Sequence, residues 1–378
     1  MMSASPESQG PSLQLLVGTY TEQMPHVNGK AEGILSCTFA GGRVGPPRLA
    51  ATIRNPSFIM ATPSGENVYA ASETFQFEGK PGGGLTSFSR DAATGDLHLL
   101  NAKPTGGDSP CFIAVDARGK FVLVANYAAS SDGGSVAVFR REEDGSLGEM
   151  TDFVEHVGSG PDPVRQVGSH PHMIIFHPLE AAEQAPDGDL LVPDLGTDVV
   201  LTYSLDPDGK LAEKQELRLP TAPGAGPRHV RFHPNRSHLF ILNELDSTLM
   251  LVRREPGGFV PITTLSTLGP GSFPNSTASE VRVAASGEFV FASNRGPDSD
   301  TIAMFRFDEH SEQLALVHLE PSRGEVPREF TLSPDDRYLL VANQNTDAIV
   351  TFEIRRDQPG LSFVSATQVP TPVSLLFP

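Results

Sequence analysis

The sequence has few cysteines, no tryptophan and no excess of basic residues. Its 378 residues include two cysteines, no C-x-x-C spacing, and 28 Lys and Arg against 46 Asp and Glu, for a formal net charge of −18. This excludes a disulfide framework and a thiolate metal site, and it is typical of a reducing compartment. Nucleic acid and anionic membranes are poor partners for such a surface, so an anionic substrate needs a local cluster of cations.

Long apolar runs are also missing. No segment approaches the ~18 consecutive apolar residues of a membrane-spanning helix. The first residues, MMSASPESQG, lack the basic and apolar regions of a secretory signal peptide. We therefore expect a cytoplasmic protein with no membrane partner, in which residues 1–12 form a flexible tail. Nothing in the sequence specifies an oligomeric state.

Glycine and proline are abundant, at about 18% together, while hydrophobic residues still make up 38%. That combination is typical of many short strands joined by turns. One template recurs about every 45 to 61 residues: a proline, a strand, a Gly/Asp turn, and an apolar strand ending on a small or amide residue. Its copies include PSFIMATPSGENVYAASE, PCFIAVDARGKFVLVANY, PRHVRFHPNRSHLFILNE and PREFTLSPDDRYLLVANQ. About four strands per repeat of this length predict the blades of a β-propeller.

Six copies are complete and a seventh is split between the two ends of the chain. LLVGTYT at residues 15–21 matches the second strand of the template, and TPVSLLFP at residues 371–378 matches its first strand. Joining them makes a seventh blade and closes the ring without a free sheet edge. The sequence therefore predicts an all-β, seven-bladed β-propeller of four-stranded antiparallel blades over residues 13–378, as one domain.

Aligning the repeats gives columns of equivalent residues near the strand ends. The residue after the leading proline is Ser57, Cys111, His172, Arg228, Ser279, Arg328 and Val373, and the next column is Phe58, Phe112, Met173, His229, Glu280, Glu329 and Ser374. The residue ending the second strand is Thr19, Ser72, Asn126, Asp194, Asn243, Asn294 and Asn343, and the one after it is Tyr20, Glu73, Tyr127, Leu195, Glu244, Arg295 and Gln344.

The column of Asn, Asp, Ser and Thr is nearly uniform, so we interpret it as structural: side chains that satisfy backbone groups at a strand end. The first and last columns differ between blades and carry charges of both signs. Because the first strands of all blades surround the central channel, these side chains are expected to meet at one mouth of it. Buried charges need partners, so the cluster is either a site or a set of structural ion pairs.

A metal site is not favoured. His170 and His172 lie one residue apart, but Pro171 between them indicates a turn, and no carboxylate or cysteine follows at ligand spacing. We expect no metal and no cofactor.

The blocks GPRHVRFHP, LFILNE, FVFASNRG and HPHMIIFHP resemble the seven-bladed propeller lactonases, a family that includes bacterial-type 6-phosphogluconolactonases and fungal carboxy-cis,cis-muconate cyclases. The resemblance covers residues 13–377 and implies a propeller that acts without an obligatory metal. It implies that the catalytic residues are those matching the family's motifs: His172, Arg228, Glu244 and Arg295. One departure is the insertion LEAAEQAPDGD after Pro178.

The expected function is hydrolysis of a sugar lactone, with 6-phosphogluconolactone favoured and the product feeding the pentose phosphate pathway. Arg228, Arg295 and Arg328 suit an anionic substrate, and an Arg can stabilise the oxyanion. His172 or Glu244 is the expected general base, because either group titrates near neutrality when it is partly buried. The further substrate-binding candidates from the columns are Arg328, Glu73, Tyr127, His229 and Gln344. Muconate cycloisomerisation and a non-catalytic binding platform remain alternatives.

Overall fold

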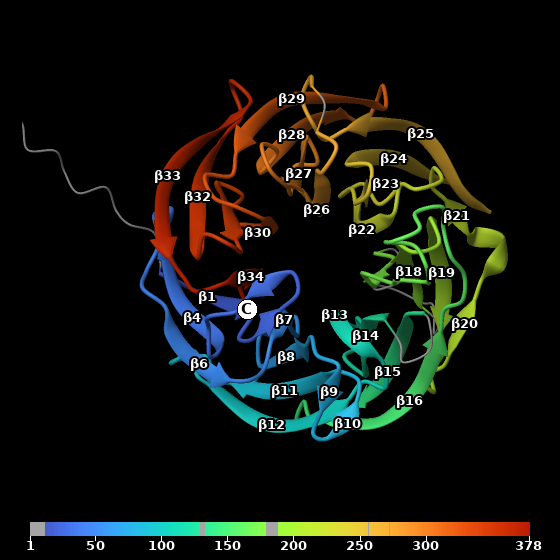
Figure 1. Ribbon diagram of the computed structural model, residues 1–378, viewed down its shortest axis with the longest axis vertical. Coiled ribbons are helices and arrows are strands. Elements are labelled where there is room, and N and C mark those ends of the chain that lie inside the picture. Colours follow the sequence, from blue (N-terminus) through green and yellow to red (C-terminus); the bar gives the residue numbers. More distant parts are fainter. Residues whose placement is uncertain (1–11, 129–132, 179–187, 256, 272) are drawn as a thin grey trace, which may run out of the picture.

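The computed structural model describes residues 12–128, 133–178, 188–255, 257–271 and 273–378. It is a ring of seven antiparallel sheets around a central channel, which confirms the predicted fold (Figure 1). Apart from one 3₁₀ turn at Gln215–Leu217, the described residues form strands and loops, and they contain no helix long and apolar enough to cross a membrane. The predicted tail of residues 1–12, apart from Ser12, lies outside the described residues.

The inner strand of each blade borders the channel and the other three follow outwards. The innermost strands are β34 (Pro372–Leu376), β7 (Pro56–Ala61), β13 (Asp108–Val115), β17 (Ile175–Phe176), β22 (Pro227–Phe232), β26 (Thr277–Val283) and β30 (Pro327–Leu332). The second strands are β1 (Leu13–Thr19), β8 (Asn67–Ser72), β14 (Phe121–Ala128), β18 (Gly188–Asp194), β23 (His238–Asn243), β27 (Phe289–Arg295) and β31 (Tyr338–Asn343).

The third strands are β4 (Gly33–Ala40), β11 (Gly84–Arg90), β15 (Ser135–Arg141), β19 (Val199–Leu205), β24 (Thr248–Glu255), β28 (Thr301–Asp308) and β32 (Ala348–Arg355). The outer strands are β5 (Arg43–Val44) with β6 (Arg48–Thr52), β12 (Leu97–Pro104), β16 (Leu147–Glu155), β20 (Leu211–Glu213) with β21 (Leu219–Pro220), β25 (Gly258–Ser266), β29 (Gln313–Pro321) and β33 (Gly360–Gln368). Two ribbons, β2 (Gln23–Met24) with β3 (Val27–Asn28) and β9 (Gln76–Phe77) with β10 (Lys80–Pro81), lie outside the blades.

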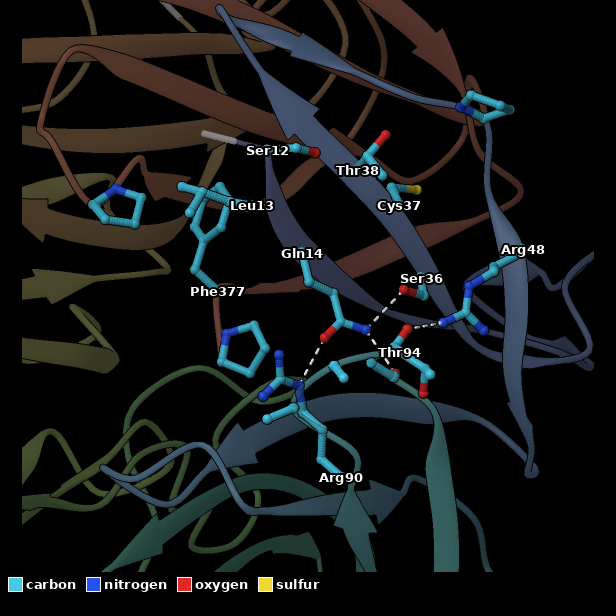
Figure 2. Close-up of a pocket in the computed structure, with 16 residues that line it drawn as sticks. Ser12, Leu13, Gln14, Ser36, Cys37, Thr38, Arg48, Arg90, Thr94 and Phe377 are labelled. Atoms are coloured by element: carbon cyan, nitrogen blue, oxygen red, sulfur yellow. Dashed lines mark hydrogen bonds between the residues drawn. The ribbon is translucent and has the colours of Figure 1, made fainter. Parts of the chain in front are cut away.

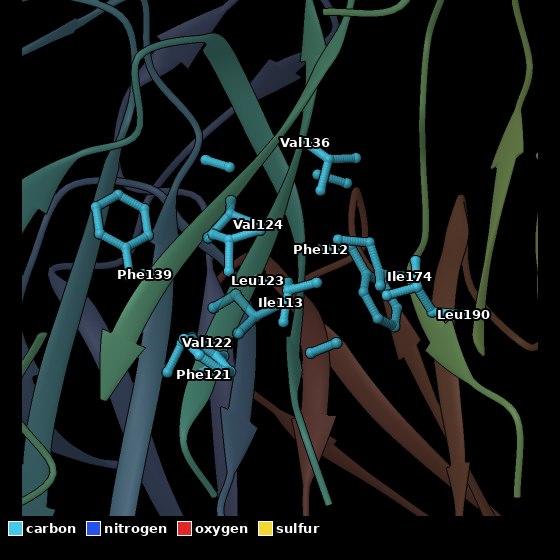
Figure 3. Packing of buried hydrophobic residues seen from close by; sticks show 14 of the residues in the cluster. Phe112, Ile113, Phe121, Val122, Leu123, Val124, Val136, Phe139, Ile174 and Leu190 are labelled. Atoms are coloured by element: carbon cyan, nitrogen blue, oxygen red, sulfur yellow. The ribbon is translucent and has the colours of Figure 1, made fainter. Parts of the chain in front are cut away.

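The hydrophobic core is divided among the gaps between neighbouring blades. Every residue of β8 and β23 is buried, because each sheet is covered by another sheet on both faces. Such strands are read as continuous apolar runs rather than as alternating ones. Figure 3 shows one such gap, where Phe112 and Ile113 of β13 belong to a cluster with Val122 and Val124 of β14 and with Ile174 of the next blade.

The ring closes where the two ends of the chain meet. β1 pairs with β34 on one side and with β4 on the other, which confirms the predicted shared blade. A polar cavity of about 520 Å³ lies beside this seam (Figure 2). Gln14 donates to Ser36 Oγ at 2.9 Å and to the Gly95 carbonyl at 2.7 Å, and it accepts from Arg90 Nε at 2.7 Å. The bonds to Gly95 and Arg90 join the terminal blade to the next one.

The fourth blade departs from the predicted template. Its first strand was expected to begin at Pro171, but only Ile175–Phe176 forms a regular strand, with an isolated bridge between Pro171 and Asp194. Pro171 and Pro193 lie on the two facing segments, and neither has an N–H to give to the ladder. The segment still follows β18, because His172 N–H donates to the Pro193 carbonyl. The insertion after Pro178 lies almost entirely outside the described residues.

Candidate functional site

A β-bulge near the start of the inner strand recurs in six of the seven blades. The register shifts between Pro227 and His229, for example, so that Arg228 is the extra residue, and the same shift occurs after Pro56, Pro110 and Pro327. Related shifts occur in β26 and opposite β34. A bulge leaves its extra residue out of the ladder and redirects the side chain. Three of these extra residues, Cys111, Arg228 and Arg328, face the channel mouth.

A cavity of about 530 Å³ lies at this mouth. Eight of the nine residues predicted for the site line it: His172, Arg228, Glu244, Arg295, Arg328, Glu73, Tyr127 and Gln344. The remaining lining residues are His26, Cys111, Arg165, Asn275, Thr277, Gly296 and Val326. Residues from six blades, and from a loop of the terminal blade, thus converge on one space. Charged residues therefore stand at the ends of apolar strands because these ends surround the cavity.

Glu244 is the centre of the charged cluster. It directly follows β23 and is 2% exposed. One carboxylate oxygen, Oε2, accepts from Arg228 Nη1 and lies 3.2 Å from Arg295 Nη2, and the other, Oε1, accepts from Arg165 Nη2 at 2.5 Å. Burial alone would raise the pKa of Glu244, but the arginines outweigh it and hold this pKa well below 4.5. Glu244 is therefore ionised at neutral pH.

His172 lies beside Arg228 in the buried wall of the cavity. Arg228 Nη1 donates to His172 Nε2 at 2.5 Å, and because a guanidinium only donates, the ring proton is on Nδ1. Burial, Arg228 and His229 hold the pKa of His172 well below 6.5, so the ring is neutral. The expected base was partly buried and titrated near neutrality. In the ligand-free site both side chains are fully buried, and neither titrates there, because burial and Arg228 act on the imidazole and three arginines act on the carboxylate.

A second ion pair lies across the cavity. Arg328 of β30 approaches Glu73 Oε2 at 3.5 Å, and the hydroxyl of buried Tyr20 donates to the same oxygen at 2.8 Å. The Arg328 guanidinium also lies 5.3 Å above the Tyr20 ring. Stacking and pairing of this kind fix a guanidinium in place. The cavity thus has cations on opposite walls.

One donor and one acceptor in the wall have no hydrogen-bond partner among the described residues. They are the buried Nε of Arg295 and the buried Oε1 of Gln344. Burial and the other arginines lower the pKa of Arg295 to about 9, so it still carries its charge at neutral pH. A buried donor without a partner costs free energy. Both residues line the cavity, so a polar ligand there lies beside them.

The repeat alignment missed Arg165, because this residue lies in the irregular loop between β16 and β17 and has no equivalent in other blades. Asp162 Oδ1 accepts from the N–H groups of Val164 and Arg165 at 2.8 and 2.9 Å and forms the turn that carries the guanidinium. The next residue, Gln166, donates from Nε2 to Asp198 Oδ1 at 2.7 Å. The Arg165 side chain is 38% exposed, unlike Arg228 at 5%. An arginine after an Asx turn was its one sequence signal.

The structure does not bring His229 to the cavity. Its ring lies one layer deeper, where Nδ1 bonds Glu280 Oε2 at 2.9 Å and the ring packs edge-on against Phe112 and His172. The bulge explains this, because it directs Arg228 to the mouth and the next side chain along the channel. Glu280 also pairs with Arg231 at 2.9 Å, and Arg282 joins Glu280 to Glu329.

His170 and the uniform column have structural contacts. His170 Nδ1 donates to the Tyr127 carbonyl at 2.8 Å, and its ring stacks on Tyr127. Asn343 Nδ2 donates to the Ser322 carbonyl and Asn294 Nδ2 to the Thr267 carbonyl, as the structural interpretation predicts. No three His, Cys, Asp or Glu side chains among the described residues gather in a metal-binding group.

The deeper cluster gives a prediction on stability. Burial, opposed by Arg282 and reinforced by Glu280, raises the pKa of Glu329 to about 7. A raised carboxyl pKa means that the folded state binds more protons, so stability falls as pH rises from about 4.5 through 7. We expect Glu329→Gln to raise Tm by about 2 °C at pH 8 and to leave it unchanged at pH 5.

The measurement is thermal unfolding of wild-type and variant protein at both pH values. Glu353→Gln is the matched control, because that carboxylate is exposed and pairs with Arg337 at 3.7 Å, and surface pairs contribute little. A loss of stability at pH 8 in Glu329→Gln would contradict the prediction.

Comparison with known proteins covers the whole propeller. The family model described as "Lactonase, 7-bladed beta-propeller" matches residues 14–377. A 6-phosphogluconolactonase of Bacillus subtilis is 33% identical over 366 residues, which cover 96% of this chain and 97% of that protein. A crystal structure of a putative 6-phosphogluconolactonase from Bacteroides fragilis has a TM-score of 0.86 at 30% identity and covers 99% of both chains. The periplasmic gluconolactonase PpgL of Pseudomonas aeruginosa has a TM-score of 0.87 at 30% identity, over 97% of this chain and 99% of its own.

Proposed function

Because the chain belongs to the seven-bladed β-propeller lactonase family, we propose that it hydrolyses a sugar lactone and that this substrate is 6-phosphogluconolactone. The observation that carries the proposal is the charge of the cavity. Four guanidinium groups and two carboxylates line it, and with neutral His172 this leaves two positive charges in a chain of net charge −18. A phosphate monoester near neutral pH carries about two negative charges, and arginine matches its geometry.

The partly exposed arginine is the first group that an entering phosphate meets. Arg165 and Arg328 lie nearest to solvent among the four in side-chain exposure, at 38% and 14%. When Arg165 turns to the phosphate, Glu244 Oε1 loses its hydrogen-bond donor and can accept a proton from water instead. The hydroxyls of the sugar lie against Gln344 and Arg295, which line the cavity.

The proposed reaction uses Glu244 as the general base. Glu244 takes a proton from water while the water oxygen attacks the lactone carbonyl carbon, and Arg228 and Arg295 stabilise the oxyanion that forms. The intermediate collapses by breaking the bond to the ring oxygen, which receives the proton back from Glu244 and becomes the hydroxyl of the open acid. His172 does not transfer the proton in this scheme; by accepting from Arg228 it positions that guanidinium. No metal or cofactor takes part.

The pathway and location follow from the proposed substrate. A phosphorylated sugar lactone arises by oxidation of a sugar phosphate, so we place the reaction in the pentose phosphate pathway and in the cytoplasm. Two free, buried cysteines are consistent with a reducing compartment. The relative named periplasmic is named as a gluconolactonase, and for that substrate class two of the four arginines would have no anionic group to bind.

The test is hydrolysis of freshly generated 6-phosphoglucono-δ-lactone by purified protein, measured against the spontaneous rate with and without a chelator. We expect chelator-resistant turnover, with kcat/KM at least about 100-fold above that for glucono-δ-lactone, because losing two charge-assisted contacts costs about 3 kcal/mol. Faster turnover of the unphosphorylated lactone would overturn the phosphate assignment. Cycloisomerisation of carboxy-cis,cis-muconate without lactone hydrolysis would overturn the reaction, and binding without any turnover would favour a platform.

Arg165 gives a separate prediction for the same assay. Arg165→Ala should raise KM for the phosphorylated lactone about 10-fold and change kcat less than about 3-fold, since it removes a contact made equally in ground and transition states. The matched control is Arg54→Ala, another exposed arginine with a carboxylate partner, Glu22, near the start of an inner strand. A fall in kcat with KM unchanged would show that Arg165 acts on the reacting atoms instead.

A further inference from the structure

A further cavity, of about 620 Å³, lies at the end of the central channel away from the proposed active site, and we call the two channel cavities front and rear. The front cavity, that of the proposed reaction, is lined by residues at the starts of the inner strands, such as Cys111, Arg228 and Arg328. The rear cavity is lined by residues at the ends of the same strands, such as Ala61, Val115 and Leu332. All inner strands run in the same direction around the ring, so the two cavities face opposite mouths. The proposed reaction uses only the first.

The wall of this rear cavity has two chemically different halves. One half is apolar and comes from β7, β13, the segment around β17, and β34; its members include Phe58, Met60, Phe112, Met173, Phe176 and Leu375. The other half comes from β22, β26 and β30 and carries Arg231, Arg282 and Glu329. A cavity with an apolar wall and a few converging polar groups is the usual form of a small-molecule site.

The charged half holds more donors than the protein satisfies. Arg231 Nη2 donates to Glu280 at 2.9 Å, but its Nε is buried without a hydrogen-bond partner among the described residues. Arg282 is shared between Glu280 at 3.3 Å and Glu329 at 3.1 Å. Buried guanidinium N–H groups without acceptors are rare, because they lose water without a replacement. The Arg231 and Arg282 side chains are 14% and 26% exposed and line the cavity, so an anion there can approach both guanidinium groups.

The charge balance of this half fits one negative group. The guanidinium groups of Arg231 and Arg282 face Glu280. Burial alone would raise the pKa of Glu280, but these two arginines keep it far below 4.5, so the carboxylate is ionised. Glu329 is close to half-protonated at neutral pH, since burial and Glu280 raise its pKa to about 7. His229, whose pKa burial lowers to about 4, is neutral. With Glu329 protonated, the cluster has one positive charge to offer, whereas the front cavity has two.

We propose that the rear cavity is a binding site for a monocarboxylate with an apolar body, such as a medium-chain or aryl-substituted carboxylic acid. Its carboxylate lies against Arg231 and Arg282, and its apolar part covers Phe58, Phe112 and Met173. The proposal does not depend on the reaction at the front mouth. It also predicts a proton linkage, because the groups facing Glu329 are Arg282 and Glu280 of β26 together with the Leu375 N–H and Ser374 hydroxyl of β34. Glu329 titrates near neutrality, and its protonation removes a repelling charge.

The test is isothermal titration calorimetry of the full chain with octanoate. We expect one molecule per chain with Kd below about 1 mM, and tighter binding at pH 6 than at pH 8. Octanol and acetate, which carry only the body or only the charge, should each bind at least about 10-fold more weakly. Equal binding of octanoate and inorganic phosphate, or no binding of octanoate, would overturn the proposal.

Variants locate the site. Arg282→Gln, whose amide can still bond Glu280, should weaken octanoate at least about 10-fold, and so should Met60→Glu, which places a like charge at a half-buried position of the apolar wall. Arg306→Gln is the matched control on the outside of a blade, where Arg306 pairs with Glu288. Octanoate should also bind Arg228→Ala at full affinity. Unchanged affinity in both rear variants, or loss in Arg228→Ala, would show that octanoate occupies a different place.

Discussion

Glu244→Gln will lower kcat for lactone hydrolysis about 10³-fold, within the range that general-base catalysis contributes. Glutamine has nearly the same shape but cannot take a proton from water, and Glu244 is the ionised carboxylate of the cavity that three arginines contact. KM should change much less than kcat. The measurement is steady-state hydrolysis of the phosphorylated lactone at 25 °C, corrected for the spontaneous rate.

This variant also removes a buried negative charge from among three arginines, so its stability must be measured beside its activity. We expect Tm to fall by several degrees, because breaking a buried ion pair costs about 3 kcal/mol or more. The control is Glu280→Gln, which breaks the deeper cluster without touching the front cavity. If Glu280→Gln loses as much kcat as Glu244→Gln, the effect is structural and Glu244 is not the base.

Arg228→Ala will lower kcat/KM about 10²- to 10³-fold, the size seen when a donor to a developing oxyanion is removed. Arg228 makes three fixed contacts, to the Ser279 carbonyl at 2.7 Å, to His172 Nε2 and to Glu244 Oε2. Its side chain is 5% exposed, so water cannot replace it easily. The loss should appear in kcat for the phosphorylated and unphosphorylated lactones alike, since the effect is on the carbonyl and not on the phosphate.

Arg228→Lys separates charge from geometry. An ammonium keeps the positive charge but lacks the planar fork that reaches three acceptors at once. We expect it to recover less than about 10-fold of the loss. Full recovery would mean that Arg228 contributes only a positive potential, and a loss confined to the phosphorylated substrate would make it a phosphate ligand.

The fold was predictable because every blade repeats the same pattern of apolar strands and turns. Strands such as VLVA and LFIL are apolar throughout, since sheets cover them on both faces, and the turns between them carry Gly or Asp in most copies. Pairing of β1 with β34 follows from two incomplete templates at the ends of the chain. The short β17 was not predicted, because the effect of Pro171 and Pro193 depends on their facing each other across two segments.

The site was predictable only where it follows the repeat. Arg228, Glu244, Arg295 and Arg328 stand at equivalent positions of their blades, so aligning the copies brings them together. Arg165 and His26 come from loops without an equivalent, and nothing in the sequence indicates how far such loops reach. His229 was predicted for the site because it stands in the column next to Arg228, but the bulge at Arg228 presents only Arg228 to the cavity, and His229 bonds Glu280 in the layer below. The protonation states also required the structure, because they depend on burial.

The bulge that recurs at the inner strands makes the mouth of the channel modular. Each bulge leaves one residue out of the strand pairing, and these residues share a backbone setting but have different neighbours. They are Ser57, Cys111, Arg228, Ser279, Arg328 and Val373. Cys111, Arg228 and Arg328 line the cavity, so exchanging one of these three changes what the cavity presents to a ligand and leaves the register of the strands in place. A change of substrate therefore requires substitutions at a few of these bulge positions, with the blades unchanged.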